Sequence, residues 1–373
     1  MSLERLSAPE RAELRSLART FLARHSAEPA VRRIVVTEES FDRSVWARLA
    51  SEVEFLRLGL PEDLGGAGQG WDVLGLLLEE SGRALLTAPL LSCLVADAAL
   101  GACAEHGADA GATDAVRKAI GAGETIVAVA VGRRDGAGRL RAQASTGRDD
   151  DGVVLNGAVT PVLDAGASNL ILVGADGRDG YGLYLVPTAD SHVTVDRLES
   201  LDLTRRAYSV VFDQARAEPV LVGDAAAAVA EHVLDLTSLA VASEELGIMQ
   251  YVLERTVEYV TVRKAFGRTV GSFQSIKHAL ADVLSDVESV RATVEFAQRH
   301  TNEEHFPLMA ALVHAQATEG GSRVATNTLL LYGAIGYTWE HHAHLYLRRS
   351  KTNEMLFGPP GEHRARLAGL AGL

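Results

Sequence analysis

The stretch Arg263–Asp282, RKAFGRTVGSFQSIKHALAD, constrains the fold most, because it lies between two long runs of helical apolar spacing. The run before it covers Asp224–Val262, and the run after it covers Phe273–Arg299. Arg263 places a cation at the end of the first run, where a positive charge suits the helix dipole. Gly267 gives the backbone freedom to turn between the runs. The stretch therefore predicts a tight corner between two long helices that pack side by side.

The C-terminal part continues in the same way. Phe306–Leu331 and Glu340–Phe357 also repeat apolar residues at helical spacing, and a short tail follows from Glu362. With the two runs around the corner, they make four long helices joined by short turns. This arrangement is typical of an up-down bundle, so residues 221–373 are predicted to form a four-helix bundle domain.

Before the bundle, the sequence pattern changes once, from helical to β-type. Residues 1–122 carry short amphipathic helical patterns, and the first begins with a capping signal and a proline at Ser7–Glu10. Residues 123–220 carry short β-type runs separated by turn pairs such as Asp135-Gly136 and Asp151-Gly152, a spacing typical of a sandwich or barrel of antiparallel strands. We therefore expect a multidomain α+β protein with an N-terminal helical domain, a middle antiparallel β domain and the C-terminal bundle.

Composition narrows the class of partner. The net charge of −13 argues against a nucleic-acid partner, although local basic residues could still bind an anionic ligand. The first residues alternate in charge and lack the apolar core of a signal peptide, and no window of 18 uncharged apolar residues suggests a membrane span. Cys93 and Cys103 lie in helical, Ala/Leu-rich surroundings and do not suggest a disulfide framework. We therefore expect a cytoplasmic protein.

Three segments resemble one known family, the acyl-CoA dehydrogenases. Arg263–Asp282 resembles the family's third-domain signature of Arg, two residues, Phe-Gly, and later a Gln and an Ala-Asp pair. Leu331–Glu340, LYGAIGYTWE, is similar to the Gly-Gly-x-Gly-aromatic segment that carries the catalytic Glu. Gly59–Gly68, GLPEDLGGAG, is similar to the N-terminal Pro-Glu-x-x-Gly-Gly-x-Gly turn, and the TWEH variant at Thr338–His341 looks like a bacterial branch. The segments occur in the family's order and span most of the chain.

The resemblance implies a fold of helical, strand-rich and helical domains, and a flavin-dependent reaction. Family members remove the α-proton of an acyl thioester with a carboxylate base and pass the β-hydride to the flavin N5 of FAD. The implied substrate is an acyl-CoA or a related thioester such as one on a carrier protein. The implied partners are an electron-transfer flavoprotein and further chains of the same or a related kind, in a homo- or heterotetramer.

Two residues are candidates for the base. Glu340 occupies, by resemblance, the family's commonest base position, although a Glu at a helix start also simply complements the helix dipole. Some family members carry the base on the helix before the corner, at a position that falls on Thr237 here. Thr237 cannot act as a base, but Glu244 lies two turns further along the same helix face. Glu244 could instead be a solvated charge, so both candidates stay open.

Five residues match family positions that contact FAD. Arg263, Phe266 and Gln274 match contacts made across a subunit interface, and an Arg suits a pyrophosphate because its guanidinium forms paired charge-assisted bonds. Gly333 and Gly336 match glycines that let the backbone approach the adenosine end. A helix-terminal cation and a plain turn are the ordinary alternatives for these residues. Separately, Arg205 lies in a segment that resembles one of the bacterial branch. It could contact CoA phosphates or a domain interface, or it could be an ordinary solvated charge.

The chain also departs from the family pattern. The family's usual Gln is Leu330 here, and the second glycine of the pair is Ala334. The flavin-facing Thr-Glu-Pro-x-x-Gly-Ser segment is replaced by VAVGRRDG after Ala128, and the later Trp-containing segment by AVTPVLDAGAS at 158–168. The leading hypothesis is that the chain is itself an FAD-dependent acyl-CoA dehydrogenase. These changes keep open an alternative, in which the chain is the FAD-poor partner subunit of a heteromeric acyl-CoA dehydrogenase.

A metal site is not expected. His341, His342 and His344 are close in sequence, but neighbouring side chains on a helix point apart. No cysteine or carboxylate set at ligand spacing completes a site around them or around His278.

Overall fold

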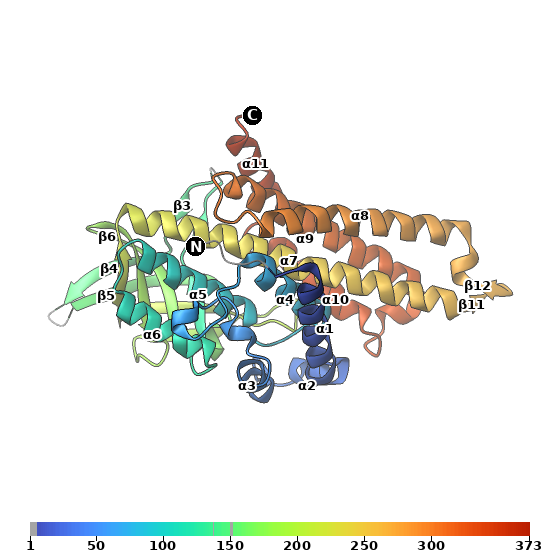
Figure 1. The fold of residues 1–373 in the computed structure, drawn as a ribbon, viewed down its shortest axis with the longest axis horizontal. Coiled ribbons are helices and arrows are strands. Elements are labelled where there is room, and N and C mark those ends of the chain that lie inside the picture. The colour runs from blue at the N-terminus through green and yellow to red at the C-terminus, as the bar shows by residue number, and fades with distance from the viewer. Residues whose placement is uncertain (1–5, 137, 150–151) are drawn as a thin grey trace.

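The computed structural model of the chain describes residues 6–136, 138–149 and 152–373. One helix, α7 (Asp224–Val262), runs through most of the length of the molecule, from the β-sheet at one end to the corner at the other (Figure 1). At 1.5 Å per residue, its 39 residues span about 58 Å. Its apolar side chains occupy all faces, as expected for a helix that is covered on every side. By length and composition α7 could cross a membrane, but 72% of its most apolar window is buried against other parts of this chain.

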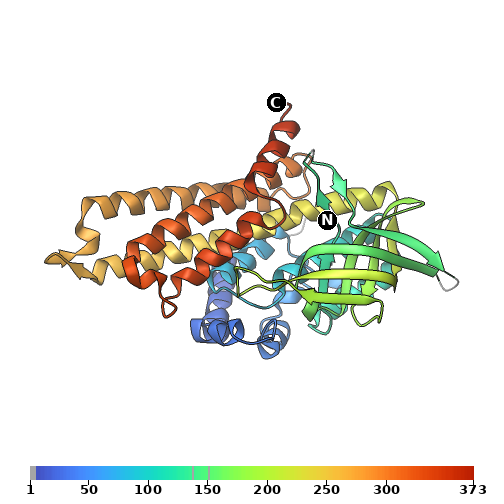
Figure 2. The ribbon, with the colours of Figure 1, turned by 180° about the vertical axis from the view of Figure 1, so that it is seen from behind.

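Three further helices run alongside the second half of α7 and confirm the predicted bundle (Figure 2). They and the final helix are α8 (Gln274–Gln298), α9 (Phe306–Tyr332), α10 (Ala343–Met355) and α11 (Pro360–Leu370). One boundary differs from the prediction. Glu340 does not begin a helix, because a 3₁₀ segment, η5 (Gly333–Tyr337), and a turn separate α9 from the start of α10.

The N-terminal part is helical, as predicted. Its helices are α1 (Ala8–His25), α2 (Glu28–Val35), α3 (Arg43–Ser51), α4 (Trp71–Arg83), α5 (Leu90–Glu105) and α6 (Ala110–Gly121), with short 3₁₀ segments η1 (Phe55–Arg57) and η2 (Glu62–Leu64). Helix α2 was not expected, because its eight residues are too few to show a clear period. Asp42 caps α3 by accepting hydrogen bonds from the backbone of Ser44 and Val45.

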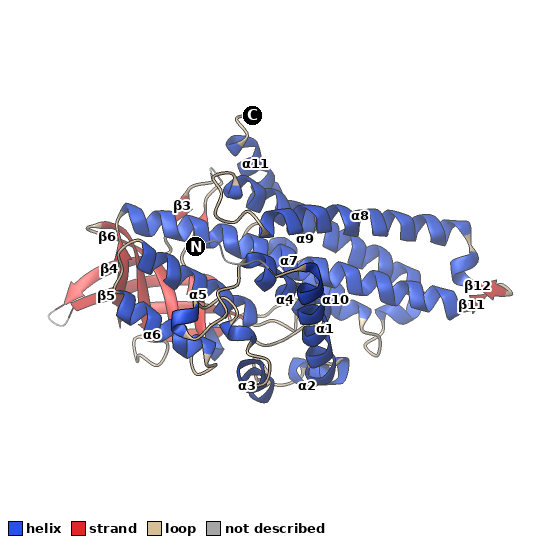
Figure 3. Cartoon of the chain, viewed as in Figure 1, coloured by secondary structure: helices blue, strands red, loops and turns tan. Residues whose placement is uncertain are grey.

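The middle part is one mixed sheet rather than a purely antiparallel sandwich or barrel (Figure 3). Its strands run in the order β10-β7-β6-β4-β5-β9-β8, and β1 pairs with β6. The bounds are β1 (Val127–Ala130), β4 (Ala144–Asp149), β5 (Gly152–Leu163), β6 (Leu170–Gly177), β7 (Gly180–Pro187), β8 (Val193–Arg197), β9 (Ala207–Arg216) and β10 (Glu218–Val222). A separate small hairpin joins β2 (Arg133–Arg134) and β3 (Leu140–Arg141).

The parallel pairs in the sheet correct the antiparallel expectation. β1 and β4 both run parallel to β6, while the other pairs are antiparallel. A sequence run does not show which distant strand it will join, and β1 enters the sheet directly from the helical domain. Of the predicted turn pairs, Asp151 lies outside the described residues.

The predicted corner is present, and it carries a small hairpin. Strands β11 (Lys264–Ala265) and β12 (Arg268–Thr269) pair antiparallel, and the 3₁₀ segment η4 (Val270–Ser272) leads into α8. The loop residues Phe266 and Gly267 have φ angles of 53° and 78°, as a two-residue turn between twisted strands requires. The hairpin projects beyond the end of the bundle, at the opposite end of the molecule from the sheet (Figure 1).

The N-terminal helices are joined to the bundle by a close approach of α4 to α7. A Cβ on Gly247 would lie 1.7 Å from the backbone oxygen of Glu79, and a Cβ on Gly82 would lie 2.0 Å from that of Glu244. Only glycine fits at these two positions, so the two helices touch backbone to backbone. This contact fixes Glu244 relative to the end of α4.

Candidate functional site

A small cavity lies where the sheet, α5 and α7 meet, between the strand domain and the helices. Its volume is about 30 Å³, and it is lined by Leu91, Ser92, Val95, Val129, Val131, Gly132, Leu163, Leu234, Thr237 and Phe357. Thr237 is the position at which some family members carry the base, and its hydroxyl donates to the backbone oxygen of Val233 at 2.7 Å. Within the described part of the chain, no carboxylate lines this cavity. The cavity is therefore small, mostly apolar and without a base.

A buried ion-pair network fills the space next to this cavity. The Arg349 guanidinium, which is fully buried, donates to Asp202 at 2.5 Å and to Glu244 at 2.5 Å. Arg349 also donates to the hydroxyl of Thr204 at 2.6 Å. Arg205 donates to the other oxygen of Glu244. Two carboxylates and two guanidiniums thus balance in charge and tie the strand domain to α7 and α10.

The charges in the network are well satisfied. Burial alone would lower the pKa of Arg349, but the carboxylates of Asp202 and Glu244 together raise it. The neighbouring Glu245 is fully buried, and burial raises the pKa of its carboxyl to about 7, although hydrogen bonds from Ser350 and Asn353 oppose the shift. Glu244 and Glu245 therefore lie in contrasting surroundings, because only Glu244 has guanidinium partners.

A smaller pocket of about 10 Å³ adjoins the network. Asp164 and Glu244 both line it. Asp164 accepts a hydrogen bond from Ser92 at 2.6 Å, and burial raises the pKa of its carboxyl. The pocket is too small for a substrate group, since even one water needs on the order of 10–15 Å³.

The structure pairs Glu244 and Arg205 with each other and with further residues between the domains. Both oxygens of Glu244 accept hydrogen bonds from guanidiniums, one from Arg205 and one from Arg349. Arg205 is equally occupied, because it donates to Glu244 and to Asn353, the latter at 2.9 Å. Arg205 therefore contacts the domain interface, which was one of its predicted roles.

Glu340 lies in an exposed turn. Hydrogen bonds from its own backbone and from Thr338 lower the pKa of its carboxyl. The backbone oxygens of Trp339 and Glu340 accept from Arg32 of α2, at 2.6 Å and 3.2 Å. Glu340 is therefore a weak base on the protein surface, and it shares no contact with Glu244 or with the cavity at Thr237.

Three of the predicted cofactor contacts lie together at the end of the bundle. Arg263 ends α7, Phe266 forms the tip of the corner hairpin, and Gln274 begins α8. All three are exposed, and Phe266 is 95% exposed. Phe266 adopts φ = 53°, a conformation costly for a non-glycine residue. An aromatic side chain that is both strained and fully exposed suits contact with another molecule.

Gly333 and Gly336 lie at the same end of the bundle, after α9. Tyr332, just before them, contacts α7 through Thr256, whose hydroxyl donates to the Tyr332 hydroxyl at 3.2 Å. Gly333 has φ = 68°, which favours glycine, and a Cβ on Gly336 would lie 2.9 Å from the backbone oxygen of Leu329. The turn thus needs both glycines for its own geometry.

The sequence-predicted residues therefore fall into two separate groups. Arg263, Phe266, Gln274, Gly333 and Gly336 lie at the bundle end, and Glu244 and Arg205 lie between the domains. The structure adds Arg349 and Asp202, which sequence reasoning missed. Arg349 follows another arginine in a helix and looks like an ordinary surface charge, and only its burial shows otherwise. Among the described residues, no cluster of three metal-ligating side chains occurs.

A helical domain, a sheet domain and a helical bundle follow one another along the chain in the order that the resemblance to acyl-CoA dehydrogenases implied. Two family models match, the N-terminal domain of acyl-CoA dehydrogenase over residues 8–119 and the C-terminal domain over residues 227–369. The chain therefore belongs to the acyl-CoA dehydrogenase family, whose members are oxidoreductases that act on the CH–CH bond of acyl-CoA.

Individual relatives agree with this assignment. Acyl-CoA dehydrogenase IpdE2 of Mycobacterium tuberculosis is 29% identical over 96% of this chain and 96% of its own length. The solved structure of a variant of the Tcur3481-Tcur3483 steroid ACAD is 30% identical with a TM-score of 0.87 and covers 98% of both chains. The ChsE4-ChsE5 complex of Mycobacterium tuberculosis is 25% identical with a TM-score of 0.89, and covers 100% of this chain and 99% of that one.

The residues between the domains do not fit a flavin ring system in this conformation. The cavity of about 30 Å³ is far below the roughly 300–1,000 Å³ that small-molecule sites occupy. Phe357, at φ = 61°, and Leu163 line it, and Ser92 and Thr237 are its only side-chain hydroxyls within the described ranges. In contrast, Arg263, Phe266 and Gln274 are exposed at the far end of the bundle, where the side chains of Gln274 and His278 form a hydrogen bond at 2.8 Å.

Proposed function

We propose that this chain acts in the α,β-dehydrogenation of an acyl-CoA thioester as one half of an assembly whose second, related chain holds FAD. The observation that carries the proposal is the cavity at Thr237, which has no carboxylate among its described lining residues and little volume. Removal of an α-proton needs a base within hydrogen-bond reach of that proton. A chain without such a base at the flavin-facing position would depend on a partner for the reaction.

The corner hairpin is the part of this chain that we expect to reach the partner's cofactor. Arg263 would pair with the pyrophosphate through charge-assisted hydrogen bonds. Phe266 and Gln274 would complete the contact from the same end of the bundle. The exposure of all three supports this role, because a projecting hairpin with an uncovered aromatic tip can insert into a neighbouring subunit.

Two similar solved structures support an assembly of unlike chains. The Tcur3481-Tcur3483 and ChsE4-ChsE5 structures each name two proteins. We propose that this chain pairs in the same manner, and that an electron-transfer flavoprotein reoxidises the partner's FAD. The partner's pocket would then determine which acyl groups can bind, because this chain's interdomain cavity is too small to hold one.

The proposal can be tested by comparing three variants in the purified two-chain complex. We expect Arg263→Ala to lower the FAD affinity of the complex at least about tenfold, as loss of a charge-assisted pair should. Lys264→Ala, the matched control one residue on, should retain wild-type affinity. Glu340→Gln should leave kcat within about twofold of wild type, because Glu340 does not line the interdomain cavity and a base must lie within reach of the proton that it removes. If Glu340→Gln instead abolished turnover while FAD stayed bound, this chain would carry the base and the proposal would fail.

A further inference from the structure

The interdomain cavity has one aromatic residue among its described lining residues, Phe357. The other lining residues belong to α5, to β1 and the residues just after it, to β5 and to α7, whereas Phe357 comes from the loop between α10 and α11. Among the described lining residues, Phe357, Val129 and Gly132 are partly exposed and the others are buried. These three residues therefore mark the mouth of the cavity, and Phe357 is the largest of them.

Phe357 places its ring at this mouth from an unfavourable backbone conformation. Its φ angle of 61° lies in the left-handed region that bulky residues avoid. The next residue, Gly358, has φ = 105°, and a Cβ on it would lie 3.3 Å from Nε2 of His363. A non-glycine residue keeps such a conformation only where its surroundings hold it. Contacts around the loop must therefore fix its position.

Two stacked histidines hold the backbone of this loop. His363 of α11 donates through Nε2 to the backbone oxygen of Phe357 at 3.0 Å, and His314 of α9 donates through Nε2 to that of Gly358 at 3.3 Å. The two rings lie 3.9 Å apart between centroids, with planes at 22°. Burial lowers the pKa of His314 to about 3 and that of His363 to about 4, so each ring carries one proton near pH 7. Neither Nδ1 has a hydrogen-bond partner among the described residues, which agrees with a proton on Nε2.

Helix α11, which carries His363, is itself fastened to the bundle. Arg366 pairs with both carboxylate oxygens of Asp235 on α7, at 2.6 Å and 3.0 Å. Arg364 pairs with Glu319 on α9 at 2.8 Å. The loop is therefore held by a helix that is tied to two others, and a shift of its backbone would break the hydrogen bonds from the histidines.

We propose that Phe357 is a plug that closes the interdomain cavity to ring-shaped ligands, and that His314 and His363 hold this plug in place. The inference rests on the proposed function, because the cavity includes Thr237, the position at which some family members carry the base. The plug gives a physical reason why this chain leaves the flavin to its partner. Without the ring, the cavity would approach the roughly 150 Å³ of an engineered apolar cavity that binds benzene.

The test measures how fast a thiol inside the cavity reacts with iodoacetamide in the whole chain. Val95 of α5 lines the cavity and is 1% exposed, so Val95→Cys places the thiol there. We expect Phe357→Gly to speed the labelling of Val95→Cys at least about tenfold, since glycine adopts a positive φ freely and the mouth is then open. Met355→Gly, at an exposed position that does not line the cavity, is the matched control and should leave the rate unchanged. The native Cys93 and Cys103 are buried, and their labelling is measured in the same variants without Val95→Cys and subtracted.

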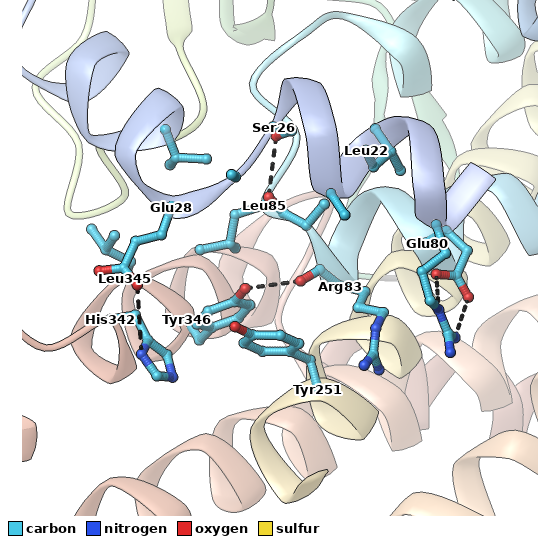
Figure 4. Close-up of a pocket in the computed structure, with 15 residues that line it drawn as sticks. Leu22, Ser26, Glu28, Glu80, Arg83, Leu85, Tyr251, His342, Leu345 and Tyr346 are labelled. Carbon is cyan, nitrogen blue, oxygen red and sulfur yellow. Dashed lines mark hydrogen bonds and ion pairs between the residues drawn. The ribbon is translucent and has the colours of Figure 1, made fainter. Parts of the chain in front are cut away.

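Benzene tests whether the opened space accepts a ring. It should slow the labelling of Val95→Cys saturably in Phe357→Gly and leave the rate unchanged where Phe357 is present. Benzene could also enter a second cavity of about 250 Å³, which α1, α2, the end of α4, α7 and α10 surround (Figure 4). The labelling rate at position 95 does not respond to that cavity, because the two cavities share no lining residue.

A second variant tests the histidines while the plug is still present. His363→Phe keeps a ring beside His314 but removes the hydrogen bond to the backbone oxygen of Phe357. The loop should then open more often, and the labelling of Val95→Cys should rise about fivefold, as the loss of one hydrogen bond predicts.

Three results would each overturn the proposal: a wild-type labelling rate in Phe357→Gly, a wild-type labelling rate in His363→Phe, or no protection by benzene. The labelling rates decide on the plug by themselves, since no flavin takes part in them. Uptake of FAD by the isolated wild-type chain is a separate measurement, and it would contradict the proposed function.

Discussion

At the scale of single residues, the buried Arg349 is the most informative side chain in the molecule. It joins Asp202 of the strand domain to Glu244 of α7, and it is fully buried. Removing one member of such a network leaves charges buried without a partner. We expect Arg349→Ala to lower the free energy of unfolding by about 3–5 kcal/mol, measured by urea denaturation. Arg348→Ala, which removes a single exposed hydrogen bond to Leu201, should cost about 1 kcal/mol or less. Equal losses of unfolding free energy in Arg349→Ala and Arg348→Ala would contradict the conclusion that Arg349 holds the buried network together.

Glu245 should make stability depend on pH. Burial raises the pKa of its carboxyl from 4.5 to about 7, so between these values the folded chain holds a proton that the unfolded chain has lost. The Glu245 contribution to stability is therefore complete below pH 4.5 and is lost as the pH rises to about 7. Glu245→Gln should remove this loss and stabilise the chain at pH 8 by up to about 3 kcal/mol.

Urea denaturation at pH 5 and pH 8 measures this effect. The wild type and Glu245→Gln should differ clearly at pH 8 and little at pH 5. Glu304→Gln, on the exposed loop before α9, serves as the control and should follow the wild type at both values. A Glu245→Gln variant that is less stable than the wild type at pH 8 would show that the carboxylate is charged and well satisfied in the folded chain.

At the scale of elements, the contact between α4 and α7 depends on glycine. A Cβ on Gly247 would lie 1.7 Å from the backbone oxygen of Glu79, so the helices must separate to admit it. We expect Gly247→Ala to lower the free energy of unfolding by about 1–3 kcal/mol or more, although alanine favours helix. Gly369→Ala in α11, where nothing lies within 4 Å of the new methyl group, should be neutral or stabilise by up to about 1 kcal/mol. Chemical denaturation measures the free energy of unfolding of both variants. If Gly247→Ala unfolds with the same free energy as the wild type, α4 and α7 are not in backbone contact.

The long elements could be predicted from the sequence, and the pairing of the short ones could not. The long apolar run of α7 and the bounds of α8 and α9 follow, to within one residue, from apolar spacing and from the corner signature, and the structure confirms them. The parallel pairing of β1 and β4 with β6 was missed, because strand neighbours depend on contacts distant in sequence. Helix α2 and the start of α10 after Glu340 were missed, because the structure of a short segment depends more on tertiary contacts than on its own apolar spacing.

At the scale of the whole molecule, the chain has an extended form with distinct ends. The sheet lies at one end, the corner hairpin at the other, and α7 links them (Figure 1). Sequence signatures identified the family and the exposed corner, because those motifs are local. They did not show that Arg205 and Glu244 neutralise each other, since the residues are 39 positions apart and only the packing of the sheet on α7 brings them together. The division of labour that we propose follows from that packing.

The central claim is that this chain completes a partner's flavin site and does not hold a flavin alone. The most direct test is the visible absorption spectrum of the chain purified by itself, after exposure to FAD, and of the chain co-purified with a related second chain. We predict that the chain alone stays colourless, and that the complex shows flavin at half the molar amount of its chains and reduces it with an acyl-CoA. Flavin equimolar with the isolated chain, bleached by an acyl-CoA, would contradict the account.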